Sequence, residues 1–177
     1  MIKAVVAESS SVQRAMGITV HTGWGACVVV GGSLDHPEIL ANSVIEILGK
    51  DERFCFHLAA EMELRAAREW LERMRAKAFA TARRKLEGLT AQSVCACAIV
   101  AKEGNVGELA HVLASHPRLH TAEGCFYRDI FHEACKVPVH IIPPASLDVS
   151  RVGKLAPPPW GRDQKLAALA AWSLLGR

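Results

Sequence analysis

The most chemically varied stretch of the sequence is HPRLHTAEGCFYRD, residues 116–129. Cys125 lies near His120, and a thiolate beside an imidazole can act as a nucleophile with its base. Thr121 is expected to cap a helix, and the amides at that helix start, together with Arg128, suit a bound phosphate. Four residues of this stretch are therefore candidates for a functional site: His120, Glu123, Cys125 and Arg128.

A structural interpretation of the same stretch stays open. Cys125 would be a small buried residue, and Tyr127 would pack in the core. Arg128 would pair with Asp129 or with Glu123.

Two other places carry groups that could do chemistry. His21, with Thr22 and Trp24, belongs to the first glycine-containing turn and is a candidate catalytic and ligand-binding residue, although capping and core packing also explain this turn. His57 and Glu61 are four residues apart, a spacing that can bind a metal or pair an acid with a base. One histidine and one glutamate do not form a site, and HExxH is absent, so we interpret His57 as a helix-start histidine near a surface glutamate.

The elements that must position these residues follow from periodicity. Apolar residues recur at steps of three and four from Ala60 to Leu86, which predicts a long helix ended by Gly88. Further helices are expected at 106–115, where Pro117 would break the helix, from Thr121 onward, and at 163–175. Strands are expected in five segments: two within 17–32, of which 24–30 is the clearer, then 38–48, 93–101 and 138–143.

Antiparallel strands followed by βαβ units predict an α/β fold with a mixed five-stranded sheet and helices on both faces. The length of 177 residues suits one domain, 1–177. Residues 1–16 would be an N-terminal extension or would contain the first strand, at 2–7. Residues 144–162, which include three consecutive prolines, would form an extended linker to the closing helix.

Composition limits the class of protein. The six cysteines form no CxxC pair and no zinc-ribbon spacing, so we expect reduced thiols and a cytoplasmic location. Cys95 and Cys97, two residues apart on an expected strand, would both be core residues. The net charge of +3 permits weak attraction to nucleic acid. No apolar run approaches the roughly 20 residues of a membrane helix, and the first residues lack a secretory apolar region, so no membrane partner is expected.

Three local matches, in this order of elements, resemble a known family. GITVHTGWGACVVVGG, from Gly17, resembles the start of the bacterial Holliday-junction resolvases, which have a ribonuclease H-like fold. EACKVPVHIIPPASL resembles the end of a resolvase helix and the strand that follows it, and DQKLAALAAW, from Asp163, is similar to the closing helix. The resemblance covers most of the chain and implies a ribonuclease H-like fold.

The resemblance also implies where catalytic acids would lie. Resolvases and ribonucleases H gather about four carboxylates around two Mg²⁺ ions. In this sequence Thr19, Val100 and Leu166 occupy three of the expected acid positions, and Asp163 keeps the fourth. A threonine, a valine and a leucine cannot replace carboxylate ligands, so the resemblance favours a degraded centre without a cofactor.

The leading hypothesis is therefore a non-catalytic binding or regulatory module of ribonuclease H-like fold, with nucleic acid as its favoured ligand. The cleft would lie between the first turn, the end of the central strand, the helix start at residues 120–129 and Asp163. Its expected ligand-binding residues are Thr19, His21, Lys102 and Arg128.

Two alternatives stay open. A divergent metal-dependent nuclease or hydrolase would use Mg²⁺ with Asp163 and either Glu103, three residues past Val100, or Glu8, if residues 2–7 are the first strand. A translation-linked module is the second alternative, because the middle domain of peptide-release factors is similar in fold and in its long helix, although GGQ is absent here. A homo-oligomer and an unspecified protein partner also stay open.

Overall fold

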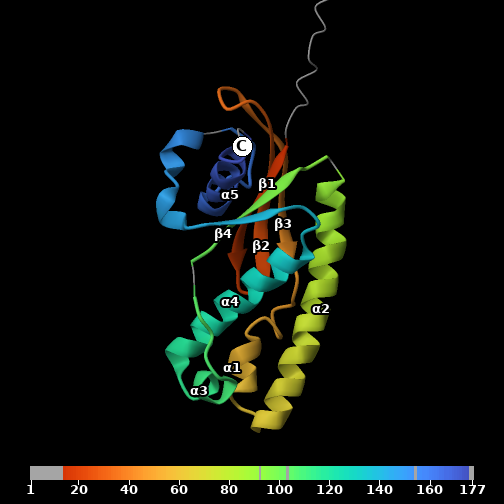
Figure 1. Ribbon diagram of the computed structural model, residues 1–177, viewed down its shortest axis with the longest axis vertical. Helices are drawn as coiled ribbons and strands as arrows, with labels where there is room; N and C mark the ends of the chain where they lie inside the picture. The colour runs from red at the N-terminus through yellow and green to blue at the C-terminus, as the bar shows by residue number, and fades with distance from the viewer. Residues whose placement is uncertain (1–13, 92, 103, 154, 176–177) are drawn as a thin grey trace, which may run out of the picture.

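Three antiparallel strands and two parallel ones form a five-stranded sheet in the order β3-β2-β1-β4-β5 (Figure 1). The computed structural model describes residues 14–91, 93–102, 104–153 and 155–175. The strands are β1 Ala15–His21, β2 Trp24–Gly32, β3 Pro37–Glu46, β4 Ala96–Val100 and β5 Val139–Ile142. This mixed five-stranded sheet confirms the predicted α/β fold class.

The antiparallel part of the sheet follows from β-branched runs joined by tight turns. A two-residue turn joins β1 to β2, since His21 pairs directly with Trp24, and Gly23 in that turn has a φ of +83°. Glycine adopts this left-handed conformation without a steric cost. The middle of β2 is buried on both faces, with Val28 and Val29 pointing into different apolar clusters. This double burial explains why its sequence is continuously apolar.

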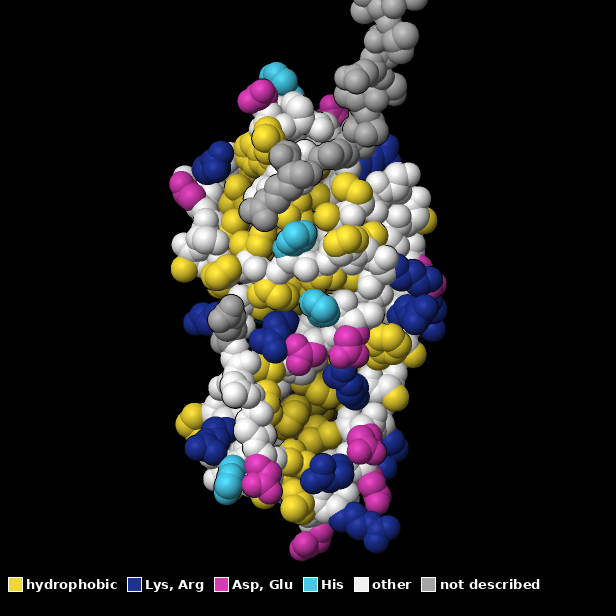
Figure 2. Space-filling model, in the orientation of Figure 1, with side chains coloured by type: hydrophobic (Ala, Val, Ile, Leu, Met, Phe, Trp, Pro, Cys, Tyr) yellow, Lys and Arg dark blue, Asp and Glu magenta, His cyan; other side chains and the backbone are white. Residues whose placement is uncertain are grey.

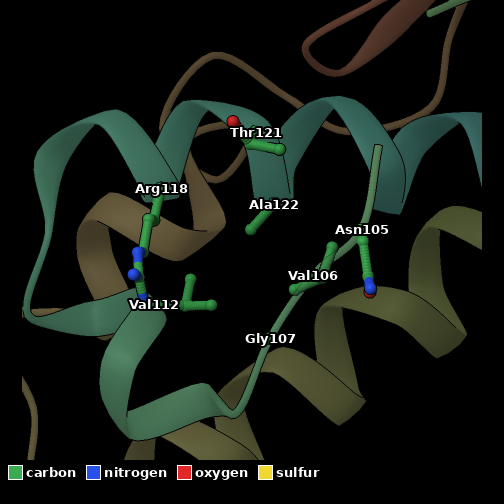
Figure 3. Close-up of a pocket in the computed structure, with 7 residues that line it drawn as sticks. All are labelled: Asn105, Val106, Gly107, Val112, Arg118, Thr121 and Ala122. Atoms are coloured by element: carbon green, nitrogen blue, oxygen red, sulfur yellow. The ribbon is translucent and has the colours of Figure 1, made fainter. Parts of the chain in front are cut away.

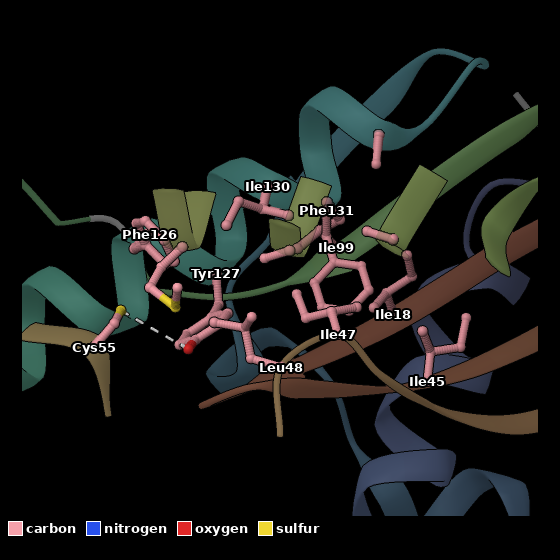
Figure 4. Packing of buried hydrophobic residues seen from close by; sticks show 14 of the residues in the cluster. Ile18, Ile45, Ile47, Leu48, Cys55, Ile99, Phe126, Tyr127, Ile130 and Phe131 are labelled. Atoms are coloured by element: carbon pink, nitrogen blue, oxygen red, sulfur yellow. Dashed lines mark hydrogen bonds between the residues drawn. The ribbon is translucent and has the colours of Figure 1, made fainter. Parts of the chain in front are cut away.

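Helices cover both faces of the sheet (Figure 1). Their bounds are α1 Cys55–Ala59, α2 Leu64–Thr90, α3 Leu109–Leu113, α4 His116–Ala134 and α5 Arg162–Trp172. On one face α2 and α4 form the larger core, in which Phe131 and Ile130 of α4 lie near Ile18 and Ile99 of the sheet (Figure 4). On the other face α5 lies so close to β1 that a Cβ atom on Gly17 would be 1.8 Å from the main-chain oxygen of Ala167.

Several expected boundaries differ from the observed ones. The long helix begins at Leu64 because the separate helix α1 and a turn precede it, and it continues past Gly88 to Thr90. The helix α4 begins at His116, so Pro117 lies in its first turn, where a missing amide proton costs nothing. Thr121 is therefore not a cap, and its hydroxyl donates to the main-chain oxygen of Pro117.

Smaller differences concern the cysteines and the proline-rich segment. Cys95 is exposed because it precedes β4, whereas Cys97 is buried as predicted. All six cysteines are free thiols. Residues 144–162 contain two 3₁₀ turns, Pro144–Ser146 and Val149–Val152, the second of which buries Val152. In the described residues, no helix combines the length and the apolar character that a membrane crossing requires.

Candidate functional site

The positions of the expected acids come together where α5 packs on the sheet. Thr19 of β1 pairs with Val100 of β4 in parallel register, and the Thr19 hydroxyl donates to the main-chain oxygen of Asp163 at 2.8 Å. Thr19, Val100 and Leu166 are 6%, 3% and 5% exposed. Val100 and Leu166 belong to the apolar cluster under α5. None of the three side chains is therefore a carboxylate that could bind a metal ion. The Thr19 hydroxyl already donates a hydrogen bond, and Val100 and Leu166 are packed hydrocarbon side chains.

The remaining acid of this group has a histidine partner. Asp163 lies in the first turn of α5, where the helix dipole favours a carboxylate, and its Oδ2 is 3.2 Å from Nε2 of His21. The His21 ring stacks on Trp24 at 4.2 Å between ring centroids. The structure therefore brings the predicted residues Thr19, His21 and Asp163 together at the ends of β1 and α5.

On the opposite face of the sheet, two adjoining hollows lie between α4 and residues 101–102 and 104–107, and we call them the α4 groove. One hollow, of about 300 Å³, is lined by Val20, Ala101, Lys102, Gly104, His120, Thr121, Gly124 and Cys125. The other, of about 390 Å³, is lined by Asn105, Val106, Gly107, Val112, Arg118, Thr121 and Ala122 (Figure 3). Thr121 borders both hollows, so they are neighbours.

The structure divides the single cleft that the sequence predicts. Side chains alternate along β1, so Ile18 belongs to the core under α4 while Thr19 points to the α5 side. Lys102 and His120 border the α4 groove, and Thr19 and Asp163 do not. Both groups lie near the carboxyl ends of β1 and β4, on different faces of the sheet.

The residues of the 116–129 stretch have mostly internal partners. Cys125 is buried, and the buried Tyr127 donates its hydroxyl proton to the main-chain oxygen of Arg53. Arg128 pairs with Asp129 at 2.8 Å and also donates to the main-chain oxygen of Lys102 at 3.4 Å. Cys125 and His120 line the same hollow of the α4 groove.

Sequence reasoning missed a cluster of three histidines. Ligand atoms of His57, His116 and His120 all lie within 4.8 Å of one another, and in the part of the chain that the structure describes this is the one such group of three. His57 lies on α1, and its partner is Glu123 on α4, not Glu61. The signal was the spacing of four between His116 and His120, which went unused because the helix was expected to begin at Thr121.

The other two metal candidates, Glu8 and Glu103, lie outside the described residues, as does the possible first strand at 2–7. The alternative nuclease centre therefore stays a prediction. Asp163, the acid common to both of its versions, is engaged with His21.

Comparisons with known proteins found similarity only at the level of solved structures. No family model and no curated protein matches the sequence. Thermus thermophilus RuvC in complex with a Holliday junction substrate is 18% identical, with 91% of each chain covered and a TM-score of 0.47. Another structure of Thermus thermophilus RuvC is 17% identical, with 91% of this chain and 92% of that chain covered and a TM-score of 0.48.

Proposed function

We propose that this chain is a non-catalytic nucleic-acid-binding module of ribonuclease H-like fold, in which the α4 groove holds the phosphate backbone. The observation that carries the proposal is the lining of this groove. Among its described residues are the cations Lys102 and Arg118 and the imidazole of His120, and none of its described lining residues is a carboxylate.

The polar character of the groove suits a flexible strand of nucleic acid. Asn105 and Thr121 add hydrogen-bonding groups, and Gly104 and Gly107 leave main-chain atoms accessible to a ligand. Phosphate contacts of this kind give affinity without reading the base sequence. We therefore expect binding with low sequence preference.

The charge distribution outside the groove favours a short binding site that contacts few phosphates. On the face shown in Figure 2, Lys and Arg side chains are interleaved with Asp and Glu and form no continuous basic surface. The net charge of the chain is only +3. Affinity should therefore depend on a few cations in the groove and fall only modestly with salt, because the salt dependence scales with the number of phosphate contacts.

The residues at the positions where the resembled family has catalytic acids support a binding role over cleavage. Val100 and Leu166 are packed in the α5 core, and the Thr19 hydroxyl is bonded to the main chain of Asp163. A two-metal centre needs several oxygen ligands that converge on hydrated cations. We propose that the module acts in the cytoplasm, in keeping with its free thiols.

Fluorescence anisotropy with labelled single-stranded, duplex and branched DNA and RNA tests this proposal. The double variant Lys102→Ala/Arg118→Ala should weaken binding by about tenfold and lower the slope of log K against log salt by about 2. The matched control is Arg65→Ala on α2, whose side chain is 93% exposed and pairs with Glu69.

Three results would contradict the proposal. The wild-type protein could fail to bind every probe, or the double variant could bind as tightly as the control. Cleavage in Mg²⁺ or Mn²⁺ that is lost in Asp163→Ala would instead support the divergent nuclease.

A further inference from the structure

Three imidazoles from two helices face one another beside the α4 groove. His116 and His120 lie four residues apart on α4, and their Nε2 atoms are 3.1 Å apart. The ring centroid of His57, on α1, is 5.2 Å from that of His116 and 4.8 Å from that of His120. The three rings meet at interplanar angles of 61° to 86°, so they do not stack on one another.

The distance between His116 and His120 matches that between two ligands of a small cation. A tetrahedral zinc ion binds imidazole nitrogens at about 2.0–2.1 Å, which places two such nitrogens about 3.3 Å apart. The observed 3.1 Å between His116 and His120 is close to this value. A spacing of four residues on a helix puts two histidines on one face, as in other metal sites built on helices.

A buried carboxylate orients the third histidine. Nδ1 of His57 is 3.0 Å from Oε1 of Glu123, whose side chain is only 2% exposed. This hydrogen bond occupies Nδ1 and leaves Nε2 of His57 available as a ligand. Histidines that bind zinc commonly donate their second ring proton to a carboxylate, which fixes the tautomer and raises the basicity of the ligand nitrogen.

We propose that His57, His116 and His120 bind a divalent ion of the zinc class, with Glu123 as the positioning residue for His57. Imidazole ligands favour Zn²⁺, Co²⁺, Ni²⁺ or Cu²⁺ over Mg²⁺, which prefers oxygen ligands. This site is therefore distinct in place and in chemistry from the carboxylate centre of the resembled family.

The surroundings leave one coordination position for water or a ligand. His57 is one-quarter exposed and the other two histidines are exposed, so solvent reaches the cluster. Three protein ligands with an open fourth position are typical of zinc sites that bind or activate a small molecule. Because His120 also lines the α4 groove, the ion would add positive charge at its border.

Calorimetric titration of untagged protein with Zn²⁺, and visible spectroscopy with Co²⁺, tests the site without any nucleic acid. Wild type should bind one ion tightly and give the intense visible bands of tetrahedral Co²⁺. His116→Ala and His120→Ala should each weaken binding by at least about 100-fold. Both residues are exposed, so these variants should fold.

The matched control is His132→Ala, an exposed histidine on the same helix outside the cluster, which should bind Zn²⁺ as wild type does. Glu123→Gln should weaken Zn²⁺ binding by about 10–100-fold, because a neutral amide orients the imidazole without raising its basicity. Circular dichroism checks that each variant is folded.

Equal Zn²⁺ affinity in wild type and His116→Ala would overturn the proposal, as would octahedral Co²⁺ spectra or the absence of binding. Loss of affinity in His132→Ala to the same extent would also overturn it, since it would indicate nonspecific surface binding. These experiments measure Zn²⁺ and Co²⁺ binding without nucleic acid, whereas the nucleic-acid proposal is tested separately with Lys102→Ala/Arg118→Ala, so the two proposals can fail independently.

Discussion

The hydroxyl of Thr19 donates a hydrogen bond to the main-chain oxygen of Asp163 and so joins β1 to the first turn of α5. This contact lies where the resembled family places its first catalytic acid. A carboxylate at position 19 would direct its negative charge at a carbonyl oxygen, in a place that is 6% exposed. The structure at this point is thus adapted to a neutral donor.

The stability of Thr19 variants should therefore depend on whether the new side chain can donate a hydrogen bond and whether it carries a charge. Thr19→Val removes one hydrogen bond and should lower the free energy of unfolding by about 1 kcal/mol. Thr19→Asp buries an unpaired charge and should lower it by about 3 kcal/mol. Urea unfolding at neutral pH measures both, and equal stability of Thr19→Asp and wild type would show that the site tolerates an acid.

Gly17 should be essential for the packing of α5. A Cβ atom there would lie 1.8 Å from the main-chain oxygen of Ala167, so Gly17→Ala must displace the helix and should cost more than about 4 kcal/mol. Gly88 lies in an exposed part of α2, and a Cβ atom there would have no neighbouring atom within 4 Å. Gly88→Ala should instead stabilise the protein by about 0.5–1 kcal/mol, and thermal unfolding of the two variants gives the comparison.

The buried thiol of Cys55 should make stability fall in alkali. Burial raises its pKa to about 12 from an ordinary value of 9.0. Its contribution is fully present below pH 9 and is lost as the pH rises from 9 towards 12, because only the unfolded thiol ionises in that window. The loss should be about 1.4 kcal/mol per pH unit for this one group.

Urea unfolding from about pH 8 to about pH 10.5, in a reducing agent, measures this effect. Cys55→Ala should have a shallower decline of unfolding free energy with pH than wild type. Ile45→Val, a buried variant without a titrating group, should lower stability equally at every pH. Parallel curves for wild type and Cys55→Ala would disprove the prediction.

Tyr127 should help to place His57. Its hydroxyl donates to the main-chain oxygen of Arg53, just before α1, and lies 3.9 Å from the Cys55 sulfur (Figure 4). Tyr127→Phe leaves that partly buried carbonyl without its donor and should lower the free energy of unfolding by about 1 kcal/mol. It should also weaken Zn²⁺ binding severalfold, whereas unchanged Zn²⁺ affinity would show that α1 is held in place without this bond.

Much of the fold was predictable from local patterns. The steps of three and four up to Leu86 identified α2, and the apolar run around Ile99 identified a central strand. The ends of helices were less predictable, because a proline such as Pro117 breaks a helix interior but suits a first turn. Only the folded chain, in which α4 begins at His116, shows which applies.

The sequence by itself determined the order of elements and the mixed α/β sheet, and it shows Thr19, Val100 and Leu166 at positions where the resemblance implies acids. Only the tertiary structure decided which polar groups meet. His57 and Glu123 are 66 residues apart in the chain, and no local pattern joins them. Periodicity reports which side of an element is buried, whereas contacts between α1 and α4 depend on how whole elements pack, so the histidine cluster emerges only from the folded chain.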